Sequence, residues 1–336
     1  MTLQIGAAGL CCAVGYRLDA AVCALRAQMD NFRESDFVCH SGEPVRVARL
    51  PDAQLWGSQR LARWVERAVR DCLRRIADFD STTTPLLLLV PEQERPHSSV
   101  SYYQEIFSAT EHSLDCRFHP LSRIVPWGRA GLGPALQTAQ RWLSEGEVQQ
   151  VLLVGVDSYL NSATIEYYLE AERLLVPGNR DGFLPGEAAA ALLLLPAAAG
   201  RPGLRIEGVA TAREEGRPDG SVPSRAFGLT RAIRQACERA GRHPHHLGFR
   251  MSDQNGEAFF AKEAANALTR VMFDGGPQLP VLQIADCLGE IGAATGPAML
   301  ALLSETMQRE DGPGQLGLLH LANDDGARTA LVVSYG

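Results

Sequence analysis

The feature of this 336-residue chain that most constrains its fold is an internal duplication. Residues 1–196 and 203–336 run through the same order of patterns: an apolar strand, an amphipathic helix, a second strand, a helix that begins in small residues, and two closing aliphatic strands. Such a repeat indicates two similar units that share one core. The sequence therefore predicts one compact unit built from two halves, with the linker AAAGRPG at 197–203.

Periodicity supports each pair of matching segments. The predicted helices carry apolar residues at spacings of three and four, and the closing strands are continuous aliphatic runs, which indicates strands covered on both faces. The pairs are opening strands at 3–10 and 204–210, helices at 58–76 and 228–241, strands at 85–93 and 247–253, small-residue helix starts at 128–146 and 289–307, and closing strands at 148–158, 188–196, 316–324 and 327–336. Two such halves predict an α/β fold with α/β/α/β/α layers.

Composition and charge exclude several classes of function. A net charge of −7 provides no basic surface for nucleic acid and no polybasic patch for a membrane. The longest apolar run, at 188–196, is too short to span a bilayer. Met1 leads directly into a predicted strand rather than a signal peptide, so a cytoplasmic protein is expected. The eight cysteines and eight histidines show no metal-ligand spacing, and the sequence predicts neither a metal site nor a cofactor.

Four stretches resemble the thiolase superfamily, specifically its β-ketoacyl synthase branch. They are GLCCAVGYRLDAAVCALRAQMDNF (9–32), VLLVGVDSYL (151–160), RDGFLPGEAAAALLLL (180–195) and GEIGAATG (289–296). The resemblance implies a thiolase fold, a five-layered αβαβα arrangement built from two duplicated halves. It also implies a homodimer, because the stretch 151–160 resembles the edge strand that pairs two subunits in that family.

The same resemblance implies a cysteine nucleophile at the start of the buried first-half helix and two histidines from the second half. In this chain Val125 stands where the cysteine belongs, Ser252 or Asp253 takes one histidine position, and Gly289 takes the other. The catalytic triad of the family is therefore expected to be degenerate, and the chain is expected not to be an enzyme.

This expectation does not depend on the alignment of single positions. There is no cysteine between Cys116 and Cys237, and there is no histidine from residue 247 to residue 319. General acid–base catalysis is worth roughly 10²–10⁴ in rate, and a covalent nucleophile divides a difficult step into two easier ones. Acyl transfer of the family's type is not expected to survive the loss of all three groups.

Three hypotheses remain open. The first is a non-catalytic adaptor or co-chaperone; the motifs resemble degenerate synthase-like proteins associated with type VI secretion effectors, so the expected partner is an effector or its chaperone. The second is an inactive subunit, similar to a chain-length factor, beside an active synthase. The third is an enzyme with a rebuilt polar site around Asp253, Glu290 and Cys287. Without a base, neighbouring carboxylates would raise the cysteine pKa rather than activate the thiol.

Overall fold

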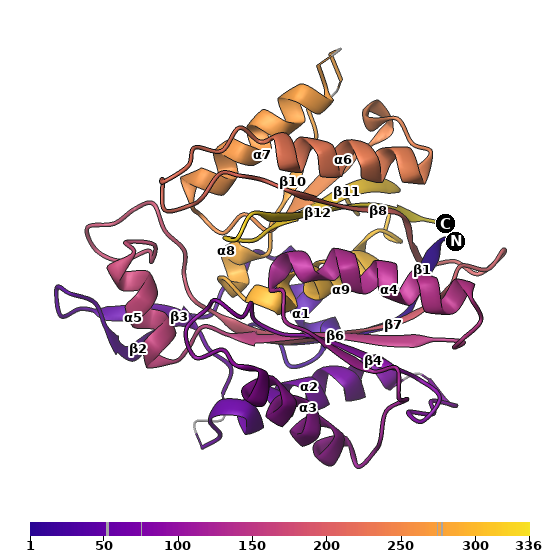
Figure 1. Cartoon of the computed structure of the whole chain (residues 1–336), viewed down its shortest axis with the longest axis horizontal. Helices are drawn as coiled ribbons and strands as arrows, with labels where there is room; N and C mark the ends of the chain where they lie inside the picture. The colour runs from indigo at the N-terminus through magenta and orange to yellow at the C-terminus, as the bar shows by residue number, and fades with distance from the viewer. Residues whose placement is uncertain (52–53, 75, 274, 277) are drawn as a thin grey trace.

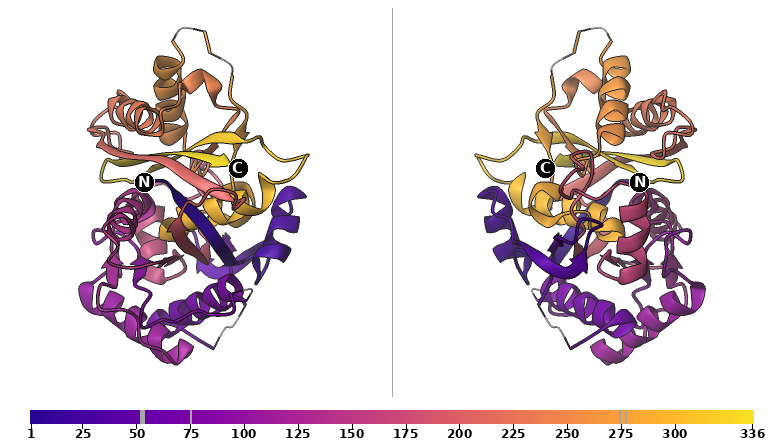
Figure 2. Two further views of the ribbon diagram at one scale, coloured as in Figure 1. Left: turned by 90° about the vertical axis from the view of Figure 1, so that its right-hand side faces the viewer. Right: turned by 90° about the vertical axis from the view of Figure 1, so that its left-hand side faces the viewer.

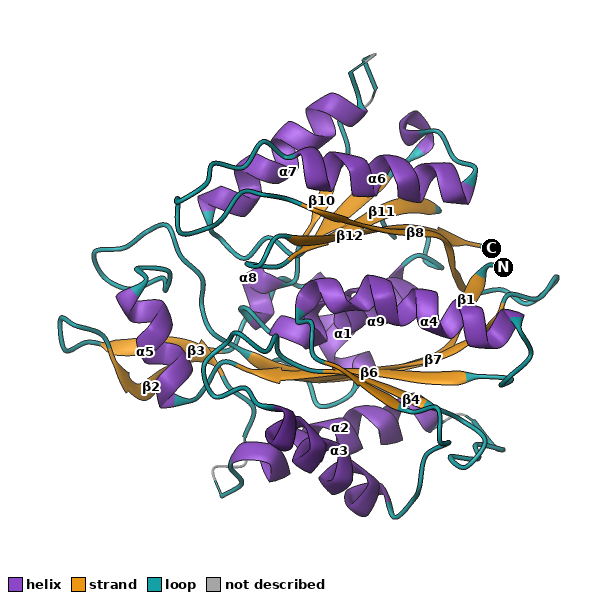
Figure 3. Cartoon of the chain, in the orientation of Figure 1, coloured by secondary structure: helices purple, strands orange, loops and turns teal. Residues whose placement is uncertain are grey.

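The computed structural model describes residues 1–51, 54–74, 76–273, 275–276 and 278–336. Its elements form five layers: two stacked sheets, a layer of helices between them, and a layer of helices on the outer face of each sheet (Figures 1 and 3). The five-layered αβαβα thiolase fold predicted from the repeat and the motifs is confirmed. β7 ends at Pro196 and β8 begins at Leu204, on either side of the predicted linker.

The first half contributes strands in the order β5-β4-β6-β7-β1. β5, β4 and β6 run parallel, and β7 is antiparallel to both of its neighbours. These strands are β1 (Leu3–Cys12), β4 (Leu86–Leu89), β5 (Arg123–Val125), β6 (Val151–Ser158) and β7 (Glu187–Pro196). Two helices, α2 (Gly57–Leu73) and α3 (Val100–Leu114), cover the outer face of this sheet.

The second half repeats the arrangement in the order β8-β12-β11-β9-β10. Its strands are β8 (Leu204–Arg213), β9 (Phe249–Ser252), β10 (Val281–Leu282), β11 (Leu316–Ala322) and β12 (Ala327–Tyr335). The outer helices are α6 (Phe227–Ala240) and α7 (Ala258–Val271). β1 pairs with β8 at Leu3 and Gln4, so among the described residues the two halves form one ten-stranded sheet folded into two layers.

The middle layer contains α4 (Leu132–Ser144) and α9 (Thr295–Thr306), together with α1 (Leu18–Arg26). α4 and α9 each follow a short 3₁₀ turn, η1 (Arg129–Gly131) and η3 (Gly292–Ala294). Most of α9 is buried because both sheets pack against it. The apolar character of this helix all round, evident in TGPAMLALL, is typical of a helix with no solvent-facing side.

Several elements were not predicted from the sequence. The hairpin of β2 (Phe32–Val38) and β3 (Pro44–Ala48) packs with α5 (Ser162–Glu170) in a lobe beside the layers (Figure 2). β10 ends at Leu282, and a short helix, α8 (Ala285–Leu288), precedes η3. The remaining 3₁₀ turn is η2 (Pro244–His246).

The predicted helix over 58–76 corresponds to α2, which ends at Leu73; position 75 of that prediction lies outside the described residues. In the part of the chain that the structure describes, no helix is both long enough and apolar enough to cross a membrane.

The predicted role of residues 151–160 as an edge strand that pairs two subunits is wrong. β6 occupies most of this range and lies inside the sheet, paired with β4 on one side and β7 on the other. Its backbone hydrogen-bonding groups are therefore already used on both sides. The edges of the ten-stranded sheet are β5 and β10. A partner that adds a strand to this sheet must bind at one of these two.

Gly155 shows how closely the central layer approaches the first-half sheet. A Cβ atom on Gly155 of β6 would lie 2.4 Å from the backbone oxygen of Ala293 and 2.9 Å from Cγ of Pro297. Both belong to the start of α9 or the turn before it, where the surroundings are backbone or rigid ring. A glycine is therefore needed for β6 and α9 to pack at this distance.

Replacing Gly155 with alanine is expected to lower the free energy of unfolding by about 1–3 kcal/mol, because the added methyl group overpacks the core. The measurement is urea denaturation followed by circular dichroism. Gly248→Ala is the matched control, since a Cβ there would meet its nearest atom, the Leu316 carbonyl oxygen, at 3.5 Å. Equal stability of the two variants would contradict this account of the packing.

Candidate functional site

Two helices of the middle layer, α4 and α9, each follow a glycine with positive φ. Gly128 precedes η1 with φ 53° and ψ −145°, and Gly289 precedes Glu290 with φ 67° and ψ −166°. Both lie in a region that L side chains rarely adopt. The sequence repeats there as well, with Gly-Arg-Ala-Gly at 128–131 and Gly-Glu-Ile-Gly at 289–292. The residue that follows each glycine, Arg129 or Glu290, is therefore held in an equivalent position.

These two repeat-equivalent residues form a buried ion pair. Nη1 of Arg129 donates to Oε2 of Glu290 at 2.6 Å, and both side chains are almost fully buried, with 6% and 3% exposed. The Arg129 guanidinium also lies 3.7 Å from Oδ2 of Asp253 and 3.5 Å from Oδ1 of Asp324. Its carbon lies 5.0 Å from the ring centre of Phe260. We call Arg129, Glu290, Asp253 and Asp324 the central cluster.

A second arginine, Arg173, forms ion pairs on the outer side of the central cluster. Arg173 donates through Nε to Glu257 at 2.6 Å and through Nη1 to Asp324 at 2.6 Å. Asn255 donates to Oε2 of Glu290 at 2.8 Å and to Oε2 of Glu257 at 3.0 Å. The charged groups are thus linked by hydrogen bonds from the centre of the molecule outward, as buried charges require.

The charges in this network do not balance. Two guanidinium groups, on Arg129 and Arg173, face four carboxylates. Burial raises the pKa of Asp253 to about 6 although the nearby Arg129 lowers it, and burial likewise raises the pKa of Glu290. Arg173 and Arg129 outweigh burial at Asp324 and hold the pKa of that carboxyl below its usual value. At Asp253 and Glu290, burial therefore opposes the charged form of the carboxyl, and the Arg129 guanidinium favours it.

The amide hydrogens at the start of α4 are already used by the protein. The Ala130 N–H donates to Oδ1 of Asn323 at 2.9 Å, and the Gly131 N–H donates to the carbonyls of Trp127 and Gly128. In an acyl-transfer enzyme such amides would stabilise an oxyanion. Here they hold the turn and the loop after β11 together, so these two donors are not available to a substrate.

A second buried ion pair lies at the start of α9. Arg95 pairs with Asp157 at the end of β6, and Oδ2 of Asp157 accepts the Ala293 N–H at 2.8 Å. The Arg95 guanidinium carbon lies 4.2 Å from the ring centre of Tyr159. Burial raises the pKa of Asp157 to about 6 although Arg95 lowers it. The space beside both helix starts is thus occupied by ion-paired side chains.

The residues predicted at the degenerate triad positions lie around the central cluster but mostly do not join it. Val125 is buried in β5, three positions before Gly128. Ser252 ends β9, and its hydroxyl accepts the Gln254 N–H at 3.2 Å. Gly289 has no side chain to contribute. Asp253 does join the cluster, where its Oδ2 also accepts the Ala322 N–H at 2.7 Å.

The predicted polar site of Asp253, Glu290 and Cys287 is brought together only in part. Arg129 bridges Asp253 and Glu290, whereas Cys287 lies on α8 and lines a separate pocket with Asp286. Burial and the Asp286 carboxylate raise the pKa of the Cys287 thiol. A thiol with a raised pKa is a poor nucleophile at neutral pH. Within the described residues, no group of histidine, cysteine and carboxylate side chains could hold a metal ion.

Sequence reasoning missed Arg129 and Arg173. A signal for Arg129 was present, because it is the one charged residue between Arg123 and Arg141 in a segment predicted to begin a buried helix. A charged residue at such a position needs a buried partner. Arg173 carried no comparable signal, since it lies in a polar stretch whose contacts depend on how the lobe docks against the second half.

No protein-family model and no curated protein matches this sequence. Solved structures do match. A β-ketoacyl synthase from Burkholderia phymatum has a TM-score of 0.77 and 15% identity over 99% of both chains. A type II PKS ketosynthase structure with its acyl-carrier protein has a TM-score of 0.78 and 13% identity over 99% of this chain and 98% of that one.

The ishigamide ketosynthase/chain length factor has a TM-score of 0.72 and 18% identity, covering 100% of this chain and 99% of its own. At these identities the matches establish the fold, which is that of thiolases and ketosynthases. They do not show the activity of this chain, which has to be inferred from its own residues.

Replacing Arg129 with methionine leaves Glu290 and Asp253 buried without their cation. We expect the free energy of unfolding at pH 7.5 to fall by about 3–5 kcal/mol, as measured by urea denaturation. Arg63→Met is the control: Arg63 is 42% exposed and pairs with Glu66, and a surface pair contributes ~0–1 kcal/mol. Adding Glu290→Leu to Arg129→Met is expected to recover stability, because it removes the unpaired buried charge. Equal losses in the two single variants would refute a central role for this pair.

The raised pKa of Asp253 predicts a pH dependence of known sign. The contribution of the Asp253 carboxyl to the free energy of unfolding is fully present below its ordinary pKa near 4. This contribution is lost as the pH rises through about 6. Asp253→Asn removes this titration but keeps an oxygen that can accept the Ala322 N–H. From pH 4.5 to pH 7.5 the variant should therefore gain stability relative to wild type, on the order of 1–3 kcal/mol.

The measurement is the difference in unfolding free energy between the two proteins across that pH range. His320 titrates in the opposite sense, because burial lowers its pKa to about 3, but it is present in both proteins and cancels in the difference. A difference that stays constant with pH would show that Asp253 remains ionised throughout.

Proposed function

We propose that this chain is a non-catalytic thiolase-fold protein that acts by binding a protein partner. The observation that carries the proposal is the Arg129–Glu290 ion pair at the start of α4, where the family resemblance implies a cysteine and two histidines. The central cluster holds arginine and carboxylate groups in their place. These groups are engaged with one another, and neither is a nucleophile for a thioester.

The free edge of β5 is the surface we propose for the partner. Among the described residues β5 pairs with β4 alone, and the Val90 N–H donates to the Val125 carbonyl. In a parallel ladder alternate residues bond to the same neighbour, so the N–H and C=O of Ile124 face away from β4. Unpaired groups of this kind are a template for a strand from another chain.

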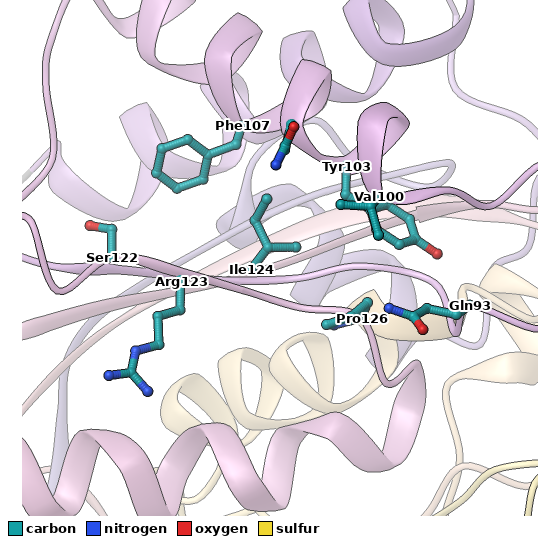
Figure 4. A pocket seen from close by; sticks show the side chains of 9 residues that line it. Gln93, Val100, Tyr103, Phe107, Ser122, Arg123, Ile124 and Pro126 are labelled. Atoms are coloured by element: carbon teal, nitrogen blue, oxygen red, sulfur yellow. The ribbon is translucent and has the colours of Figure 1, made fainter.

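Apolar surface lies beside this edge. Val100 and Trp127 are 59% and 54% exposed, and a pocket of about 410 Å³ lies between the side chains of α3 and those of β5. Figure 4 shows Tyr103 and Phe107 from α3 on the side of this pocket opposite Ile124 and Pro126. Exposed aromatic and aliphatic groups next to a free strand edge are typical of a protein interface.

Two partners are proposed for this surface. On the motif resemblance, the chain is an adaptor or co-chaperone that assists a type VI secretion effector, with the effector or its chaperone bound at β5. The second candidate is an active ketosynthase, with this chain as a subunit similar to a chain-length factor. It is favoured by the solved structures that match, among them a ketosynthase in complex with its chain length factor from Xenorhabdus doucetiae, with a TM-score of 0.73. A second copy of the chain could occupy the same edge.

Ile124→Pro tests the proposed surface, since it removes the outward N–H without removing a bond to β4. We expect the variant to fold normally but to lose its complex when co-expressed with the proteins encoded beside it, measured by light scattering after gel filtration. Recovery of an effector, a ketosynthase or only a second copy identifies the occupant. Arg242→Ala, which removes an exposed ion pair with Glu207 of β8, is the control. An undiminished complex with Ile124→Pro would place the partner elsewhere.

The absence of acyl chemistry has its own test. Incubation with cerulenin or with a chloroacrylyl pantetheine probe is expected to label no residue at the start of α4, because that turn carries no thiol and burial raises the pKa of the Cys12 and Cys287 thiols. Intact-protein mass spectrometry measures the outcome, with an active ketosynthase as the positive control. Stoichiometric labelling, at Cys287 or any other residue, would instead support an enzyme with a rebuilt site.

A further inference from the structure

The opposite end of the ten-stranded sheet carries a second free edge. In the part of the chain that the structure describes, β10 pairs with β9 alone, and the Arg250 N–H donates to the Pro280 carbonyl. By the alternation of a parallel ladder, Leu282 bonds to β9 and the N–H and C=O of Val281 point away from it. Val281 is 43% exposed. The backbone at this position can therefore accept another strand.

This edge borders a cavity that reaches from β10 to α1 and α9. Its volume is about 650 Å³, and the three consecutive residues 281–283 form one wall. Leu25 at the end of α1, Leu302 and Leu303 on α9, and Cys287 on α8 supply apolar surface. A strand added to β10 would thus place every second side chain against aliphatic groups, as the alternation of strand side chains requires.

The rim of this groove has an excess of negative charge. Asp286 is exposed at the groove, and Asp30 lies close enough to act with it in raising the pKa of the Cys287 thiol. Neither carboxylate has an ion-pair partner among the described residues. The one basic residue that lines the groove, Arg26, is paired with Asp311. The groove is therefore complementary to basic side chains.

We propose that this groove binds an extended segment of a partner protein, with alternating apolar and basic side chains, as an added strand on β10. The outward N–H and C=O of Val281 would bond to the segment's backbone, the apolar side chains would enter the groove, and the basic ones would face Asp286 and Asp30. Strand addition of this kind derives affinity from main-chain hydrogen bonds and specificity from pockets for alternate side chains. The inference is independent of the proposed function, since an active enzyme with this edge would bind the same segment.

The test uses three fluorescein-labelled five-residue peptides and the full chain. One alternates lysine with valine, the second alternates glutamate with valine, and the third alternates lysine with glycine. Fluorescence anisotropy at low salt is expected to give at least tenfold tighter binding for the lysine–valine peptide than for either control. Equal binding of the lysine–valine and lysine–glycine peptides would show nonspecific charge attraction and overturn the proposal.

Two variants locate the binding. Val281→Pro removes the outward N–H and is expected to weaken binding of the lysine–valine peptide at least tenfold, whereas Ile124→Pro at the other edge leaves it unchanged. Asp286→Lys, a surface change, is expected to shift the preference toward the glutamate–valine peptide. If Val281→Pro and Ile124→Pro bind the peptide equally well, the groove is not the site.

Hydrogen exchange provides a measurement on the unmodified protein, so the result does not depend on how a proline variant folds. Adding the lysine–valine peptide should slow amide exchange in a proteolytic fragment that contains residues 281–283 and leave fragments containing residues 123–125 unchanged. Protection at 123–125 alone would assign the peptide to the β5 surface and overturn the proposal for β10.

Discussion

The ion pair between Arg129 and Glu290 is the interaction on which the centre of this molecule depends. It joins Arg129, the first residue of the turn before α4, to Glu290, which lies two residues before the turn that leads into α9. A buried guanidinium at a helix N-terminus is unfavourable to the helix dipole as well as costly to desolvate. Three carboxylates within 3.7 Å offset that cost, so the arginine, the acids and the fold are interdependent.

The duplication explains why such a pair can exist. Two turns related by the repeat place their side chains toward the same interior point, where one arginine and one glutamate satisfy each other. In a catalytic thiolase fold the resemblance implies that this space holds a nucleophile and its substrate. Here Glu290 also accepts the Gly292 N–H at 2.8 Å and the Asn255 amide, so its carboxylate is held on several sides. A site filled in this way favours a protein that acts through its surface.

The two edge strands of the sheet, β5 and β10, are then the places where the sheet can bind a strand of another chain. β6 and β7 lie inside the sheet and pair with a strand on each side. β5 and β10 lie at its two ends, so each has unpaired backbone groups on its outer side. Each edge has a cavity beside it, apolar next to β5 and rimmed by carboxylates next to β10. The two edges therefore differ in the charge of the surface beside them.

Much of the fold could be predicted from the sequence because its signals are local. Continuous aliphatic runs such as 188–196 predicted buried strands, and the spacing of apolar residues predicted α2 and α6. The lobe of β2, β3 and α5 was missed because no residue of β2 is buried and the core of the lobe forms only when the hairpin and the helix meet. The order of strands was partly mistaken, since an aliphatic run such as 151–160 identifies a buried strand without naming its neighbours.

The sequence by itself determined the repeated two-half architecture and the lack of a thiol or an imidazole at the expected positions, because periodicity and residue identity are properties of the chain alone. Only the tertiary structure decided what occupies the centre and which strands are free. Arg129 and Glu290 are 161 positions apart along the chain, and hydrogen bonding between strands is set by how the halves fold together. Contacts of that range depend on packing, which no local pattern of residues specifies.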